Sequence, residues 1–161
     1  MAIRILRCSL FLAAALMSAT ADPQEADRYV PVKAPYAQTL VRNTSAAHPE
    51  MTFIGLHVTP PGKPDNVIIA CTDQSKIGRV STELDMAIIK NKDTKVHFSK
   101  PRNDYEVDQW FSDAAGDTLG MIVFHFAGAS TKSEDDAVRF ATAIRAELQK
   151  SIPNRERLFQ E

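Results

Sequence analysis

Residues 119–126 read Leu-Gly-Met-Ile-Val-Phe-His-Phe, and this stretch decides the fold. Its apolar side chains fall on both faces of an extended chain, which is typical of a strand in the middle of a sheet covered on both sides. Residues 52–58 alternate between the two faces and predict a second strand. Residues 66–72 predict a third, and the proline-rich loop 59–65 should join these two strands as a hairpin.

Shorter strands are predicted over residues 95–98 and 105–111. Helices are predicted after Pro35, after Thr82, which with Asp85 forms a capping box, and after Ser133. The strands mostly follow one another, with no repeated alternation of strand and helix. This order favours an α+β domain whose central antiparallel sheet of about five strands has an N-terminal helix and a long C-terminal helix.

The first residues have the pattern of a signal peptide. Arg4 and Arg7 precede an apolar run at 10–17, and Ala19-Thr20-Ala21 then fits the small-x-small motif of a cleavage site. The run is less than half of the about 20 apolar residues that a membrane span needs. We therefore expect cleavage near Ala21-Asp22 and a periplasmic or secreted, bacterial protein.

Charge and cysteine content further narrow the classes of protein to which the chain could belong. The chain has 19 basic and 20 acidic residues, and two of the basic residues lie in the leader. The mature net charge of about −3 argues against a nucleic-acid partner. Cys71 would remain alone, so no internal disulfide is expected. The expected division is a signal peptide at 1–21, an extended polar arm at 22–35, the domain at 36–153 and a C-terminal tail at 154–161.

Signatures of catalysis or of cofactor binding are missing from the sequence. It contains no nucleophile elbow, phosphate-binding loop, dinucleotide fingerprint or paired zinc-binding histidines of known motifs. If the strands at 52–58 and 119–126 are neighbours, His57 and His125 share one face of the sheet, but a metal site needs a third ligand. We therefore expect no enzyme, no cofactor and no metal.

The segment from Cys71 to Arg79 is the strongest candidate for a binding site. Here a buried strand runs into a loop rich in hydrogen-bonding side chains, which is how small-molecule pockets fix the orientation of a ligand. The same side chains would also serve to cap the turn and the next helix, and the pattern alone favours neither interpretation.

Two stretches resemble the extracytoplasmic sensor domains of the Cache type, which are PAS-like. Residues 66–79 resemble the strand and loop of those domains, and residues 113–123 resemble their hairpin and last strand. The helix at 36–47 that leads into the strand at 52–58 is a weaker third likeness. The resemblance, to a stand-alone secreted form, implies a central antiparallel sheet that binds a small metabolite.

The leading hypothesis is therefore a periplasmic domain that binds or senses a small polar or anionic molecule. Arg79 would pair with an anion, because a guanidinium offers two parallel donors to a carboxylate. The other candidate ligand-binding residues are Thr72, Asp73, Tyr105 and Trp110. The alternative is a protein-interaction module that docks on a membrane receptor or an envelope protein.

Overall fold

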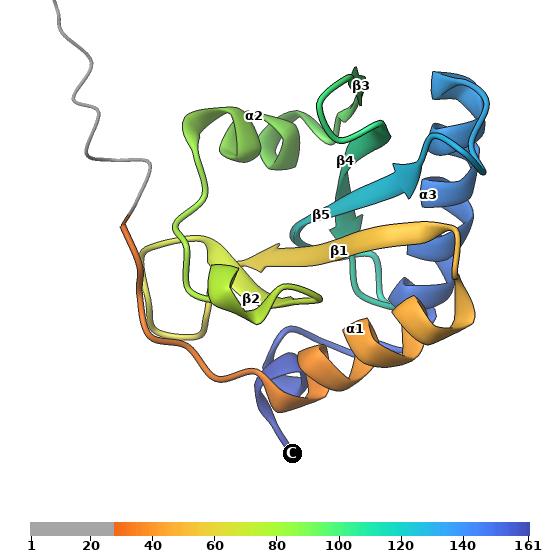
Figure 1. Ribbon diagram of the computed structural model, residues 1–161. Coiled ribbons are helices and arrows are strands. Elements are labelled where there is room, and N and C mark those ends of the chain that lie inside the picture. The colour runs from red at the N-terminus through yellow and green to blue at the C-terminus, as the bar shows by residue number, and fades with distance from the viewer. Residues whose placement is uncertain (1–27) are drawn as a thin grey trace, which may run out of the picture.

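The structure is a computed structural model that describes residues 28–161. The expected leader and residues 22–27 of the expected arm lie outside the described residues. Within residues 28–161 the chain forms one five-stranded antiparallel sheet and three α-helices, so the prediction of an α+β fold with about five antiparallel strands is confirmed (Figure 1).

The strands lie in the order β2-β1-β5-β4-β3. Short 3-10 helices, η2 and η3, follow β2 and α3. The elements in chain order are α1 (Pro35–Ala47), β1 (Met51–Val58), β2 (Val67–Cys71), η2 (Gln74–Lys76), α2 (Glu83–Asn91), β3 (Thr94–Ser99), β4 (Asp104–Ser112), β5 (Thr118–Ala127), α3 (Glu134–Lys150) and η3 (Glu156–Phe159).

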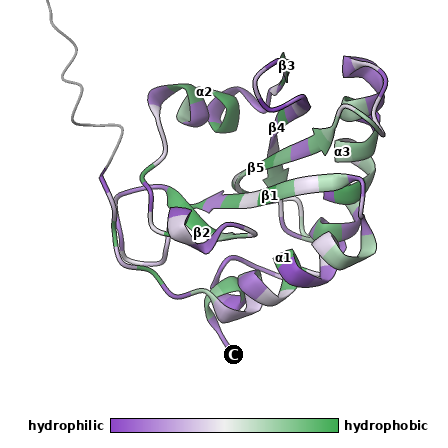
Figure 2. Cartoon of the chain, viewed as in Figure 1, coloured by the Kyte–Doolittle hydropathy of each residue, from purple (hydrophilic) through white to green (hydrophobic). Residues whose placement is uncertain are grey.

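Strand β5 is in the middle of the sheet, between β1 and β4, as its apolar sequence predicts. The hairpin of β1 and β2 is also confirmed. Gly120 allows β5 to approach β1 closely, because a Cβ atom at this position would lie 1.8 Å from the carbonyl oxygen of His57. The hydrophobic colouring of β1 and β5 in Figure 2 follows this central position.

The two faces of the sheet are covered by different helices. Helices α1 and α3 bury one face in the larger core, which includes Ile54, Ile122 and Phe124. Helix α2 covers the other face, where Ile88 packs in a smaller cluster with Phe53, Ile68, Cys71, Met121 and Val123. The smaller cluster leaves room between α2 and the sheet, and the candidate site lies there.

The chain on either side of 36–153 also packs against the domain. The N–H of Val30 donates to the oxygen of Gly78 at 2.7 Å, so the arm pairs with the segment that follows η2. Gly78 has φ of +90°, a backbone conformation that glycine adopts without the strain other residues would have. Leu158, in η3, is fully buried. The helices between residues 28 and 161 include none that is long and apolar enough to cross a membrane.

Candidate functional site

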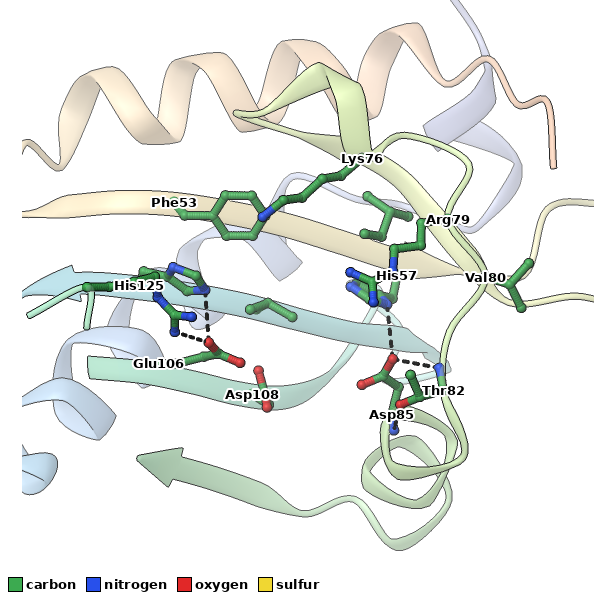
Figure 3. A pocket seen from close by; sticks show the side chains of 13 residues that line it. Phe53, His57, Lys76, Arg79, Val80, Thr82, Asp85, Glu106, Asp108 and His125 are labelled. Carbon is green, nitrogen blue, oxygen red and sulfur yellow. Dashed lines mark hydrogen bonds and ion pairs between the residues drawn. The ribbon is translucent and has the colours of Figure 1, made fainter. Parts of the chain in front are cut away.

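A cavity of about 320 Å³ lies between the sheet and the segment that joins β2 to α2; we call it the sheet cavity. Strands β1, β5 and β4 form its floor, and the segment from η2 to α2 forms its roof (Figure 3). Most of its side chains are charged or titratable. The lining residues are Phe53, His57, Ile68, Lys76, Arg79, Val80, Thr82, Asp85, Arg102, Glu106, Asp108, Val123 and His125.

His57 is buried at the β2 end of the cavity floor. Its Nδ1 lies 2.8 Å from Oγ of Ser81, and that hydroxyl donates to Oδ1 of Asn66 at 2.6 Å. Because the hydroxyl proton goes to Asn66, Nδ1 must donate to Ser81, and Nε2 is then left as an acceptor. Burial lowers the pKa of His57 to about 4, against the opposing effect of Asp85, and the positive charge of Arg79 lowers it further. His57 is therefore a neutral imidazole at neutral pH.

The opposite end of the floor holds a cluster of four charged or titratable side chains. Both ring nitrogens of His125 lie 3.3 Å from carboxylate oxygens, Nδ1 from Asp104 and Nε2 from Glu106. Arg102 donates to both carboxylates, with two bonds of 3.1 Å to Asp104. These donors, His125 first, lower the pKa of Glu106 to about 2 against the effect of burial. Glu106 is thus an ionised carboxylate whose charge is already balanced.

Asp108 lies between these two ends of the cavity floor, and no cation of residues 28–161 balances the charge of its carboxyl group there. Figure 3 shows its carboxyl between those of Glu106 and Asp85. Burial, then the negative charges of Glu106 and Asp85, raise its pKa to about 7. Its Oδ1 is buried and has no hydrogen-bond partner among the described residues. A carboxyl group with this pKa can both accept and donate a proton at neutral pH, as acid–base chemistry requires.

The roof supplies the cations. Lys76, on η2, reaches over the ring of Phe53, with Nζ 4.6 Å from the ring centroid. The same ring lies against His125 at 4.8 Å, so Phe53 orders both side chains. Arg79 follows η2 and lines the cavity beside His57. At the start of α2, Asp85 accepts from the N–H of Thr82 in the predicted capping box, which is confirmed.

The structure brings together some of the residues predicted from sequence. Arg79, His57 and His125 all line the sheet cavity. Strands β1 and β5 pair with Phe53 opposite His125 and His57 opposite Met121, so the two histidines share one face but are four residues apart along β1. Within residues 28–161 no group of three or more His, Cys, Asp or Glu side chains is placed to hold a metal ion.

The other four predicted residues do not line this cavity. Asp73 caps η2 through bonds to the N–H and hydroxyl of Ser75, which is the capping role that the sequence left open. Thr72 is exposed, and its hydroxyl accepts from the N–H of Ile54. Tyr105 packs on the α1–α3 side of the sheet. Trp110 contacts the cations of Lys92 and Arg145. Their role as ligand-binding residues stays a prediction.

Sequence reasoning missed the carboxylates of β4, which we call the acidic wall: Glu106 and Asp108 line the cavity, and Asp104 pairs with its neighbours Arg102 and His125. Asp104, Glu106 and Asp108 stand at every second position of β4, so their side chains share one face of the sheet. This period-two pattern of carboxylates is the signal in the sequence that could have indicated the acidic wall. Lys76 lies within the candidate segment from Cys71 to Arg79 but was not predicted to bind a ligand. Cys71, in contrast, is fully buried, and burial raises the pKa of its thiol to about 11, so it is not a reactive thiolate.

No protein-family model and no curated protein matches the sequence. The structure is similar to that of a type II free methionine-R-sulfoxide reductase from Thermoplasma acidophilum. The two chains are 18% identical, the match covers 71% of this chain and 89% of the other, and the TM-score is 0.43. At this level the likeness assigns neither a family nor an activity to the chain.

Two expectations from the sequence are not upheld. The resemblance to Cache-type sensor domains has no support, because no family model matches the sequence, and the similar solved structure is described as a reductase. The expectation that the chain is not an enzyme is not upheld either: the similar structure is that of an enzyme, although the likeness assigns no activity to this chain. The fold and its cavity are compatible with binding a small molecule.

Proposed function

We propose that the protein binds a small, polar, anionic molecule in the sheet cavity, where Lys76 and Arg79 hold the negative group of the ligand. The observation that carries the proposal is the position of Lys76. Its ammonium group lines the cavity over the face of Phe53, and no carboxylate of the described residues forms an ion pair with it. A half-buried cation of this kind gains more from a ligand anion than a solvated surface lysine does.

Arg79 supports the proposal from the same side of the cavity. It lines the roof three residues after Lys76, so the two cations come from one short segment. The cation at the other end, Arg102, is engaged by Asp104 and Glu106. An anion would bind beneath the segment from Lys76 to Arg79, with Lys76 as a point charge and Arg79 as a two-pronged donor.

Titration with pentanoate, a carboxylate of suitable size, tests this proposal. Calorimetry or NMR should detect binding to the protein. Lys76→Ala and Arg79→Ala should each weaken it by about ten- to a hundredfold, as expected for the loss of a charge-assisted hydrogen bond. Lys132→Ala removes an exposed lysine that does not line the cavity and is the matched control.

The melting temperatures of the same variants separate binding from structure. If Arg79→Ala lowers the melting temperature and leaves pentanoate affinity unchanged, Arg79 braces the loop and does not hold the ligand. If neither Lys76→Ala nor Arg79→Ala changes the affinity for pentanoate, the proposed anion site is wrong. Export to the periplasm or medium, and docking on a membrane receptor or envelope protein, stay predictions that rest on the sequence alone.

A further inference from the structure

Asp108 is a half-buried carboxyl group, and the cation opposite it in the sheet is already engaged. Across the β3–β4 pairing, Lys95 stands directly opposite Asp108. The ammonium group of Lys95, however, lies 2.7 Å from Oδ2 of Asp93. On the other side of β4 the residue opposite Asp108 is Val123, which offers no polar group. Asp108 thus lines the cavity while one of its carboxyl oxygens is buried without a donor among the described residues.

A second cavity of about 580 Å³ adjoins this position beneath α2; we call it the helix cavity. It shares Thr82, Asp85, Glu106 and Asp108 with the sheet cavity, so the two spaces meet at the acidic wall. The α2 side of the helix cavity is largely apolar, with Leu84, Ala87 and Ile88 on one face of the helix.

The apolar side of the helix cavity reaches the surface. Leu84 lines it and is nevertheless 78% exposed, the largest exposure among the bulky apolar side chains of the described residues. Met86 is also exposed, at 43%, but it lines neither cavity. An apolar chain that enters beneath α2 would cover Leu84 and leave Met86 in solvent.

We infer that Asp108, with Asp85 beside it, is the binding site for the ammonium group of a ligand whose short apolar chain lies in the helix cavity. The inference rests on the proposed function in one respect only, because the anionic group of the same ligand would lie in the sheet cavity. An ammonium group supplies the donors that Asp108 lacks and offsets the repulsion among the carboxylates of the wall. The ligand class is therefore a small aliphatic amine that also carries an anionic group for Lys76 and Arg79.

The affinity for such an amine depends on the proton of Asp108. Other titratable or charged side chains line the two cavities from each element around Asp108. They are Glu106 on the same strand, Asp85 on α2, His57, His125 and Arg102 at the floor, Asp93, Lys95 and His97 at β3, and Lys76 and Arg79 in the roof. Asp108 must be ionised to bind a cation, so affinity should rise with pH. With the pKa of Asp108 at about 7, the ionised fraction rises about tenfold from pH 6 to pH 8.

Butylamine is the first probe, because it carries the ammonium group and a chain without the anion. Its affinity should rise by about tenfold from pH 6 to pH 8 in the wild-type protein. Asp108→Asn should weaken binding at pH 8 by about ten- to a hundredfold and abolish the pH dependence. Asp135→Asn, at an exposed carboxylate on α3, is the matched control and should change neither. Unchanged butylamine affinity in Asp108→Asn would overturn the inference.

A series of amines tests the helix cavity. From methylamine to butylamine, each added methylene should tighten binding by about fourfold, because it is buried beneath α2. Leu84→Ala should reduce this gain, and Met86→Ala, on the same helix but outside the cavities, should not. If all the amines bind with equal affinity, their alkyl chains lie in solvent, and this part of the inference is refuted.

The two proposals can fail separately. If pentanoate binds and butylamine does not, the ammonium site is wrong and the anion site stands. If butylamine binds and pentanoate does not, the ammonium site stands and the anion site is wrong. If both are right, 2-aminohexanoate, which joins the two groups, should bind more tightly than either probe.

Discussion

Replacing Asp108 by asparagine should remove a pH-dependent loss of stability. Folding raises the pKa of Asp108 from 3.8 to about 7, chiefly through burial and then through Glu106 and Asp85. The folded protein therefore holds this proton more tightly than the unfolded chain does. The stability that the proton contributes is fully present below about pH 4 and is lost as the pH rises through about 7.

The size of the effect follows from the two pKa values. At about 1.4 kcal/mol for each pH unit between 3.8 and about 7, the loss reaches on the order of 4 kcal/mol above pH 8. That is a large part of the about 5–15 kcal/mol that stabilises a typical domain. His57 acts in the opposite direction: its pKa falls from 6.5 to about 4 on folding, so its contribution is lost as the pH falls through that range.

Urea denaturation of the wild type and Asp108→Asn at several pH values measures this loss. The difference between the two proteins removes the contribution of His57 and isolates Asp108. The free energy of unfolding of Asp108→Asn relative to the wild type should rise by about 4 kcal/mol from pH 4 to pH 8. The control Asp135→Asn should run parallel to the wild type. Parallel profiles for Asp108→Asn as well would refute the assigned electrostatics of the acidic wall.

Four further predictions concern the fold and export. Ile122→Asp should abolish folding, because an unpaired carboxylate in the fully buried core costs several kcal/mol, and a melting curve like that of the wild type would contradict this. Cys71→Ser should cost only about 1–3 kcal/mol, since a hydroxyl can keep the bond that the thiol donates to the main chain, and a complete loss of folding would count against it. Gly120→Ala should lower the free energy of unfolding by about 3 kcal/mol or more, measured in urea, because its Cβ would overlap the His57 carbonyl; an unchanged midpoint would show that β1 and β5 can separate there. The intact mass of the exported protein should correspond to a chain that begins at Asp22, and the mass of the full-length chain would refute the cleavage site.

Much of the sheet could be predicted from sequence because local patterns determine it. The apolar run at 119–126 can be buried on both faces only in the middle of a sheet, and that is where β5 lies. The alternation at 52–58 separates the side chains of β1 between the two cores. The pairing of β1 with β5 needed the assumption that they are neighbours, since no pattern in either strand specifies its partner. That assumption placed His57 and His125 on one face of the sheet, where the structure also has them.

The site was predictable only where one segment forms it. Arg79 was found because it ends a strand and loop segment that lines the roof. Glu106 and Asp108 were missed because a carboxylate on a strand is usually solvated, and nothing in β4 shows that a helix covers it. Strand β3 separates helix α2 from β4 in the sequence, and the space between α2 and β4 depends on how few residues of α2 are buried. Of its nine residues only Ile88 is buried.

The acidic wall also links ligand binding to stability. Ionisation of Asp108 lowers the free energy of unfolding, and a bound ammonium group would offset part of this loss. A ligand that binds only the folded state raises stability in proportion to the logarithm of its concentration over its dissociation constant. Butylamine should therefore raise the melting temperature more at pH 8 than at pH 6, and in Asp108→Asn this difference should vanish. A buried carboxylate that destabilises the empty protein and is relieved by a cation is better explained by binding than by folding.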